Sequence, residues 1–319
     1  MDPQSPLSSL PPQRSTLQNI FLNERGLRAG WRLGIFVLLL MAIFFVIITV
    51  VRLLDHLRGP SAAAPDGVAP IGQLIAEVVT FAGVLFATWV MSLIEHRKVG
   101  EYGLPLQRSS LLTFVRGYIL WGFLPLTGLL LALRALHAFY FGNIGLHGLE
   151  IVHWAALWGL VFLFVGLAEE YMFRGYALHA LADGIGFWPA AIVLAVLFAW
   201  VHAFNAGENR IGLIGVALFA IYASATIWRT GTLWLAVGAH AGWDWGESYF
   251  FGVSDSGTQA QGHLLNPHLA GSAWLSGGSV GPEGSVLTLV LLALMTVLFL
   301  ALYRPKKTAE LVEFPNNRP

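Results

Sequence analysis

The sequence predicts an all-α protein, a polytopic membrane bundle of about eight transmembrane helices, each with the roughly 20 apolar residues that a bilayer requires. Three observations lead to this fold class. Of 319 residues, 56% are hydrophobic and 11% charged, and the mean hydropathy is +0.67, outside the usual range of soluble domains. Long apolar stretches recur along the chain, and Lys and Arg cluster in only some of their connections.

The predicted spans follow one another with short polar connections, which favours one compact bundle without a linker. We expect the third span to be irregular because it contains Arg116 and Pro125, and the fourth because it contains two glutamates. The seventh is clear only up to Asp244. The spans run approximately over 31–53, 71–94, 111–135, 152–180, 187–206, 211–228, 231–250 and 285–303.

Three regions are expected along the chain. Residues 1–30 are polar and rich in Pro and Ser, which predicts a partly disordered tail and not a signal peptide. Residues 31–303 form the membrane domain, and 304–319 a cytoplasmic tail. With 18 basic and 18 acidic residues, nothing indicates a nucleic-acid partner, and the absence of cysteine excludes disulfides and thiolate chemistry.

Basic residues orient the bundle, because Lys and Arg in short loops are retained on the cytoplasmic side. They precede or open the first span, lie between the second and third, and follow the eighth, whereas the connection 252–284 contains no Lys or Arg. We therefore expect both termini in the cytoplasm and the protein in a bacterial inner or plasma membrane. The clusters comprise Arg14, Arg25, Arg28 and Arg32, then Arg97, Lys98 and Arg108, then Arg304, Lys306 and Lys307.

Charged residues inside the spans are candidates for function, because an ionised group at mid-bilayer costs a few kcal/mol or more. Glu169 and Glu170 follow a long uncharged run, and helix geometry turns neighbouring side chains about 100° apart. Glu170 and Arg174 have the i, i+4 spacing of an ion pair. Glu169 has no such partner, so we expect it to face another helix. For Glu77, a working carboxylate and a neutral or interfacial one are both open interpretations.

Two further spans carry histidines. Phe198 and His202 share one helix face at i, i+4, and so do His240 and Asp244. A lone membrane histidine is more often a hydrogen-bonding residue than a catalyst, and we assign His153, His179, His263 and His268 to packing or loops. An unpaired carboxylate, two histidines and an aspartate in three hydrophobic spans are harder to explain by packing alone.

Together these residues resemble a known family. The pattern Glu-Glu-x-x-x-Arg occurs at 169–174, Phe-x-x-x-His at 198–202 and His-x-x-x-Asp at 240–244. In this order they are similar to the motifs of the CPBP intramembrane proteases, which include type II CAAX prenyl endopeptidases and bacteriocin-immunity (Abi) proteins. The motif resemblance covers roughly 150–250. Asp244 stands where the prenyl endopeptidases have asparagine.

The resemblance implies an intramembrane endopeptidase that cleaves a membrane-bound or lipidated protein or peptide, with CAAX processing as one candidate reaction. It implies Glu169 as the general base, His202 as a ligand of the attacking water, and His240 with Asp244 at the oxyanion. Glu170 and Arg174 would orient the first glutamate. We also expect Phe198 and Trp243 to line the substrate cavity.

Metal dependence is left open by the sequence. Glu169, His202 and His240 would make a reasonable three-ligand zinc site, although the spacing is not His-Glu-x-x-His and no cofactor is certain. Depth is a further question. At 1.5 Å per residue, Glu169 and His202 are expected to differ in depth by roughly 15 Å. The helical pattern of the fourth span continues through 172–184, and a longer helix would centre Glu169.

Other classes of function remain open at this point. The same acidic and imidazole groups, with Glu77, would serve a proton- or ion-coupled transporter. A transporter predicts inverted repeats and broken helices, which the sequence does not show clearly. A third alternative is a non-catalytic bacteriocin-immunity protein or membrane scaffold that keeps the polar cluster for packing.

Overall fold

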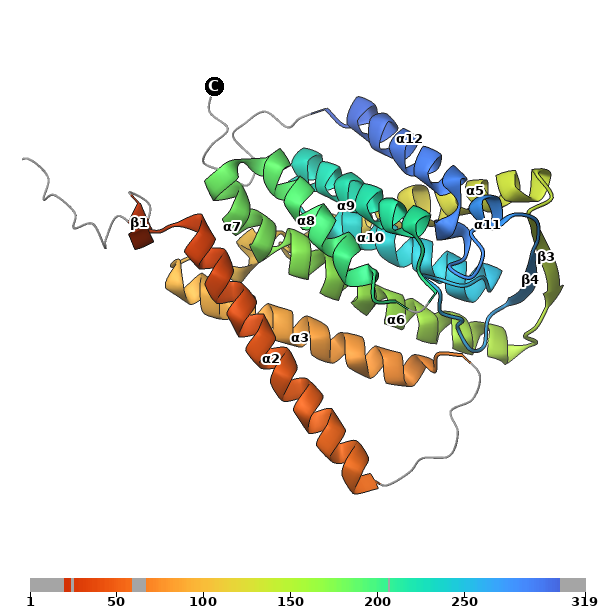
Figure 1. Cartoon of the computed structure of the whole chain (residues 1–319), viewed down its shortest axis with the longest axis horizontal. Coiled ribbons are helices and arrows are strands. Elements are labelled where there is room, and N and C mark those ends of the chain that lie inside the picture. Colours follow the sequence, from red (N-terminus) through yellow and green to blue (C-terminus); the bar gives the residue numbers. More distant parts are fainter. Residues whose placement is uncertain (1–19, 24–25, 59–66, 206, 305–319) are drawn as a thin grey trace, which may run out of the picture.

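A computed structural model describes residues 20–23, 26–58, 67–205 and 207–304 as a bundle of helices (Figure 1). All eight predicted spans are helical. Five helical segments are long and apolar enough to cross a membrane, namely Ala29–Leu54, Pro70–Ile94, Arg108–Ala135, Leu149–Ile185 and Arg210–Thr230. Shorter apolar helices are Phe187–His202 and Val286–Leu302. The described part of the chain is therefore an all-α polytopic membrane bundle, as predicted.

Five predicted spans are single helices, and three are divided. The single helices are α2 (Ala29–Arg58), α3 (Pro70–Ile94), α8 (Phe187–His202), α9 (Arg210–Thr230) and α12 (Val286–Leu302). The divided spans are α4 (Arg108–Arg116), η2 (Gly117–Phe123) and α5 (Leu124–Ala135), then α6 (Leu149–Arg174) and α7 (Tyr176–Ile185), then α10 (Trp234–Asp244) and η3 (Trp245–Phe251).

The divisions fall in the spans where the sequence is least regular. The segments η2 and η3 are π-helical. η2 ends two residues before Pro125, and η3 begins just after Asp244. Pi-helical turns inside longer helices are often found at functional sites. The two segments contact each other, and η2 also packs along α10, the helix from which η3 continues.

Short elements connect the helices. The strands β3 (Phe139–Ile144) and β4 (Leu265–Leu269) pair antiparallel, with Phe139 opposite Leu269 and Ile144 opposite Leu265. This pairing was not predicted, and it joins the loop before α6 to the long connection after η3, at the right of Figure 1. The others are β1 (Leu22–Asn23), β2 (Gly26–Leu27), η1 (Val99–Tyr102), α11 (Ala273–Ser276) and η4 (Pro282–Gly284).

The helix α10 occupies the centre of the bundle, where it contacts α4, η2, α6 and α9. All of its residues from 235 to 244 are buried. Its sequence permits this close packing, because Cβ atoms at Gly238 and Gly242 would lie 2.1 Å and 2.2 Å from the carbonyl oxygens of Phe114 and Tyr118. Small residues four apart are a common means of close helix contact in membranes.

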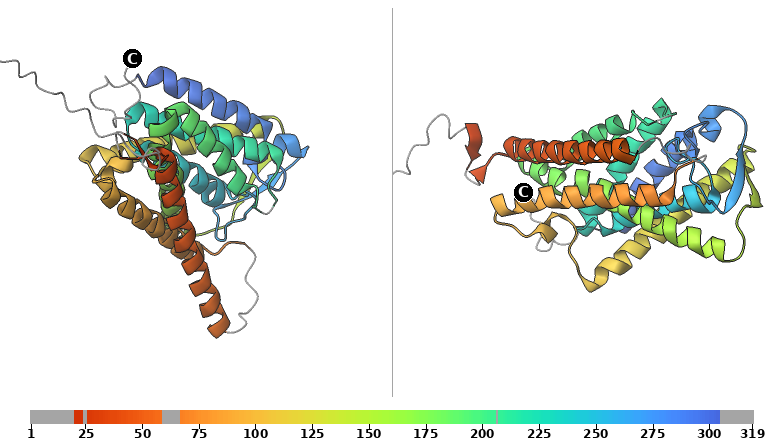
Figure 2. Two further views of the ribbon diagram at one scale, coloured as in Figure 1. Left: turned by 60° about the vertical axis from the view of Figure 1, so that its left-hand side comes forward. Right: turned by 90° about the horizontal axis from the view of Figure 1, so that it is seen from below.

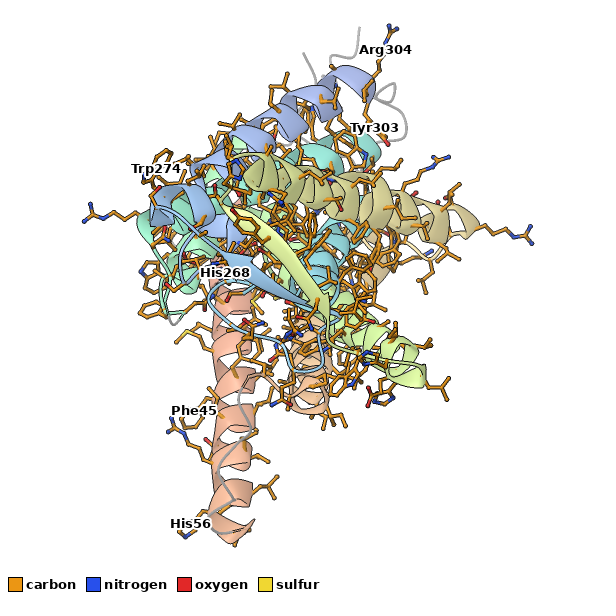
Figure 3. The ribbon with its side chains drawn as sticks, turned by 90° about the vertical axis from the view of Figure 1, so that its right-hand side faces the viewer. Phe45, His56, His268, Trp274, Tyr303 and Arg304 are labelled. Atoms are coloured by element: carbon orange, nitrogen blue, oxygen red, sulfur yellow. The ribbon has the colours of Figure 1, made fainter. Side chains whose placement is uncertain are left out.

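The helix α2 crosses the outside of the bundle, and its second half projects beyond the other helices (Figures 1 and 2). Phe45 and His56 mark the projecting half in Figure 3. Its first turn is anchored instead. Arg32 makes a bidentate ion pair at 2.7 Å with Glu95, the residue that caps the end of α3, and its Nη1 also pairs with Asp183 of α7 at 2.5 Å.

Most of the predicted tails lies outside the described residues. The tail residues that the structure does not describe are 1–19, 24–25 and 305–319. Residues 59–66 of one connection and residue 206 also lie outside the described part of the chain. The described end of the predicted N-terminal tail forms β1 and β2, which pair with each other. The boundaries 1–30, 31–303 and 304–319 stay predictions.

Candidate active site

The first motif lies at the end of α6, where the helix path changes. At Gly175 the backbone departs from helical geometry, with φ −78° and ψ −116°, before α7 begins. A Cβ atom there would lie 2.4 Å from the carbonyl oxygen of Tyr171, so this close turn requires glycine. The turn is followed at once by α7, and Leu149–Ile185 forms one candidate span of 37 residues.

Glu170 points into the protein. Its side chain is 0% exposed, and its Oε1 accepts a hydrogen bond from Arg174 Nη1 at 3.2 Å, which confirms the predicted i, i+4 ion pair. The same oxygen lies 2.9 Å from His240 Nδ1. Glu170 therefore links α6 to α10 as well as to its own helix.

Glu169 points the other way, as helix geometry predicts. Its side chain keeps 30% of its surface exposed, and its Oε2 lies 3.8 Å from His202 Nε2 and 3.7 Å from His240 Nε2. The expected depth difference between Glu169 and His202 is therefore absent. The extended α6 and α7 segment places Glu169 inside the span, and α8 ends at His202, so the two side chains meet.

The two histidines are held through their other ring nitrogens. His202 Nδ1 lies 2.8 Å from the carbonyl oxygen of Phe198, one turn earlier in α8, and donates to it. His240 Nδ1 is bonded to Glu170, as described above. Both rings thus turn Nε2 toward Glu169. His240 Nε2 also lies 3.5 Å from Asp244 Oδ2 at i, i+4 in α10.

Phe198 and Trp243, which were predicted to line the substrate cavity, are both buried and do not line the main cavity. Arg174 stacks on the Phe198 ring with 4.2 Å between the guanidinium carbon and the ring centroid. Phe198 is 2% exposed and Trp243 4%. They line a small cavity of about 40 Å³ that shares His240 and Asp244 with the main one.

The main cavity has a volume of about 480 Å³ and is rich in carboxylates. Glu77 of α3 lines it, and Gln73 Nε2 donates to Glu77 Oε1 at 2.6 Å, so this glutamate belongs to the same cavity as Glu169. The acidic residues that line it are Glu77, Glu169, Asp244, Asp255 and Glu283, and His240, Ser248, Ser256, Trp158 and Phe162 are among the other lining residues.

The sequence analysis missed the acidic residues after the third motif. Glu247 of η3, Asp255 of the following loop and Glu283 of η4 come together beside the cavity. Burial raises the pKa of the Asp255 carboxyl to about 6, and burial together with the Asp255 charge raises the pKa of Glu283 to about 7. No local sequence pattern predicts this cluster, because only the path of the connecting loop brings Glu283 close to Glu247 and Asp255.

The three predicted zinc ligands do not all lie close together, although Glu169 Oε2 is 3.8 Å from His202 Nε2 and 3.7 Å from His240 Nε2. Ligands on a tetrahedral zinc, at about 2.0–2.2 Å, lie roughly 3.3–3.6 Å from one another. Among the described residues, the group of three His, Asp or Glu residues with ligand atoms all within 4.8 Å of one another is Glu247, Asp255 and Glu283. Glu169, His202 and His240 are not such a group, so no chemical step below uses zinc.

Residues 151–246 match the family model described as Rce1-like, type II CAAX prenyl endopeptidase. The matched range contains all three motifs and extends from the first turn of α6 through α10. The match confirms, over residues 151–246, the resemblance predicted from the motifs. No significant match to the chain was found among curated proteins or among solved structures.

Proposed function

Because residues 151–246 match a type II CAAX prenyl endopeptidase family, we propose that this protein is an intramembrane endopeptidase with Glu169 as general base. Its substrate is a membrane-bound or lipidated protein or peptide. One observation carries this proposal: Glu169, alone of the two neighbouring glutamates, opens into the cavity and faces Nε2 of both histidines.

The distances suit a water molecule held between these groups. A gap of 3.8 Å between Glu169 Oε2 and His202 Nε2 is too long for a direct hydrogen bond, yet one water can bond to both atoms. Because His202 Nδ1 carries the proton given to Phe198, its Nε2 is an acceptor. The water would then donate one hydrogen to Glu169 and the other to His202, with its lone pair free for attack.

Proton transfer completes the reaction. As the water oxygen bonds to the peptide carbonyl carbon, Glu169 accepts a water proton, and the carbonyl oxygen becomes an oxyanion. In its doubly protonated form, His240 is placed to donate to that oxyanion from Nε2 while it donates from Nδ1 to Glu170, whose carboxylate offsets the positive charge of the imidazolium. Protonated Glu169 then gives its proton to the leaving nitrogen as the C–N bond breaks, which yields an amine and a carboxylic acid that loses its proton to water.

The other motif residues act on the geometry of this site. Glu170 and Arg174 fix the end of α6 and orient His240, and Arg174 also packs on Phe198, whose carbonyl holds His202. Asp244 faces Nε2 of His240 and needs a proton or a neighbouring cation beside a developing oxyanion. We assign positioning roles to Glu170, Arg174, Phe198 and Asp244.

The substrate proposal is tested with the purified full-length protein in detergent. We expect it to cleave a fluorogenic peptide that carries a prenylated CAAX terminus, and to cleave the same peptide without the lipid more slowly. Mass spectrometry of the fragments identifies the bond. Glu150→Gln, an exposed change outside the cavity, is the matched control and should cleave like wild type. Absence of fragments from every lipidated peptide in a panel would contradict the endopeptidase assignment.

Removing metal from the protein tests whether the cleavage reaction proceeds without zinc. We expect protein treated with a zinc-selective chelator to retain its cleavage rate, because the catalytic groups lack zinc spacing. Elemental analysis of the same preparation checks that zinc has been removed. A rate that is lost with the chelator and restored by zinc alone would make the site a metalloprotease site.

A further inference from the structure

Three carboxylates from separate parts of the chain meet beside the catalytic cavity. Glu247 belongs to η3, Asp255 to the loop that follows, and Glu283 to η4, and one oxygen from each lies within 4.8 Å of the other two. Asp255 and Glu283 also line the cavity that contains Glu169. The proposed reaction uses none of the three.

Glu247 indicates that the cluster receives a ligand. Its side chain is 0% exposed, and its Oε1 is buried without a hydrogen-bond partner. An unpaired buried carboxylate is costly, and close carboxylates repel one another. None of the ion pairs formed among the described residues includes Glu247, Asp255 or Glu283. The connection 252–284 contains no Lys or Arg that could supply a positive charge.

We propose that Glu247, Asp255 and Glu283 bind a hard divalent cation, with calcium as the favoured ion. Carboxylate oxygens are the preferred ligands of such ions. Calcium bonds at about 2.3–2.6 Å and accepts flexible oxygen geometries, whereas magnesium demands a near-ideal octahedron and keeps several of its waters, so a cluster of three protein carboxylates favours calcium. One oxygen from each of the three lies within 4.8 Å of the other two, which is close enough for all three to contact one calcium ion.

Neighbouring donors hold the three carboxylates in place. Trp243 Nε1 donates to Glu247 Oε2 at 2.8 Å, and Ser248 Oγ donates to Asp255 Oδ2 at 3.0 Å. The backbone nitrogen and Oγ of Ser256 both donate to Glu283 Oε2, at 3.1 Å and 2.9 Å. Each carboxylate thus has one oxygen held by a protein donor, and Glu247 Oε1 is buried without a partner.

A cation here would join three segments of the cavity wall. It would tie η4, which comes just before α12, to η3, which continues from the helix that carries His240 and Asp244. The site does not depend on proteolysis, since the ion contacts none of the groups proposed to react. Calcium binding and stability can therefore be measured without a substrate.

The test uses full-length protein in detergent after chelation with EDTA. We expect added calcium to raise the melting temperature, and terbium, a calcium substitute, to luminesce on tryptophan excitation because Trp243 bonds to Glu247. Calcium should displace terbium. Glu247→Gln, Asp255→Asn and Glu283→Gln should each weaken calcium binding at least tenfold, since loss of even an outer-shell partner costs roughly 10- to 100-fold.

Controls keep the result independent of misfolding and of the protease proposal. Glu150→Gln, an exposed acidic change, should bind calcium like wild type. Ser256→Ala removes a support of Glu283 without removing a ligand, and should weaken binding less than Glu283→Gln. Wild-type protein without a calcium-dependent melting shift or terbium signal would overturn the site, as would unchanged calcium affinity in all three carboxylate variants. The carboxyls would then be kept neutral by shared protons.

Discussion

Glu169 and Glu170 are neighbours in α6, but they lie in different surroundings. Glu170 is fully buried between Arg174 and His240, whereas Glu169 keeps 30% of its side chain exposed and faces the cavity. The difference arises from the 100° turn between consecutive helix residues. One glutamate can therefore hold the structure while its neighbour remains available to water.

The buried glutamate should matter chiefly for stability. Glu170→Gln leaves the guanidinium of Arg174 buried without its carboxylate, and breaking a buried pair typically costs about 3–5 kcal/mol. We expect a lower melting temperature in detergent, measured by a thermal shift assay, and Glu150→Gln should show no such change. Adding Arg174→Met to Glu170→Gln should recover part of the loss, because the unpaired charge is removed. A melting temperature equal to wild type in Glu170→Gln would contradict the structural role of the pair.

At the scale of elements, the position of α10 determines the site. His240 lies between Gly238 and Gly242, the two glycines that let the backbone of α4 and η2 approach this helix. The same packing sets the distance from His240 to Glu169 and Glu170 on α6. The site geometry therefore depends on residues that carry no chemistry.

Gly242→Ala tests this dependence. The added Cβ would lie 2.2 Å from the Tyr118 carbonyl oxygen, so α10 must move, and overpacking of this kind costs about 1–3 kcal/mol. We expect lower thermal stability and slower peptide cleavage together. Gly128→Ala in α5 is the matched control, because no atom lies within 4 Å of its added Cβ, and it should be neutral or slightly stabilising. Equal stability of the two variants would mean that α10 is not packed this closely.

For the whole molecule, the open question is which side faces the cytoplasm. The basic clusters adjoin the start of α2, the end of α3 and the end of α12, whereas β4 and the connection 252–284 lack Lys and Arg. Figure 1 shows the start of α2 and the strand β4 at opposite ends of the bundle. This separation agrees with both termini in the cytoplasm and the connection 252–284 outside it.

Cysteine labelling measures the orientation, because the chain contains no cysteine of its own. Ser109→Cys and Ser272→Cys introduce thiols at exposed positions near the two ends. In intact cells, a membrane-impermeant maleimide should label Ser272→Cys, and it should label Ser109→Cys only after the membrane is permeabilised. The opposite pattern would reverse the orientation.

The fold followed from the sequence because lipid imposes strict rules on length and hydropathy. Arg116 with Pro125, and the carboxylate at Asp244, marked the spans that proved to be divided into α- and π-helical segments. The pairing of β3 with β4 had no comparable signal, since it joins loops 120 or more residues apart in sequence, as with Phe139 and Leu269.

The site was predicted in part. The i, i+4 spacing identified the Glu170 and Arg174 pair, and the lack of a partner for Glu169 predicted its contact with another helix. Periodicity could not reveal that Glu170 also contacts His240, because helix rotation about its axis is set by packing. The cluster of Glu247, Asp255 and Glu283 was missed because its assembly depends on the path of a long loop.

The central claim is that Glu169 activates the water that cleaves the peptide bond. The most direct measurement is the cleavage rate of Glu169→Gln beside its melting temperature, with a lipidated peptide that wild-type protein cleaves. We expect kcat to fall by roughly 10²- to 10⁴-fold, the contribution typical of a general base, with an unchanged melting temperature. A folded Glu169→Gln protein that cleaves at the wild-type rate would contradict the claim.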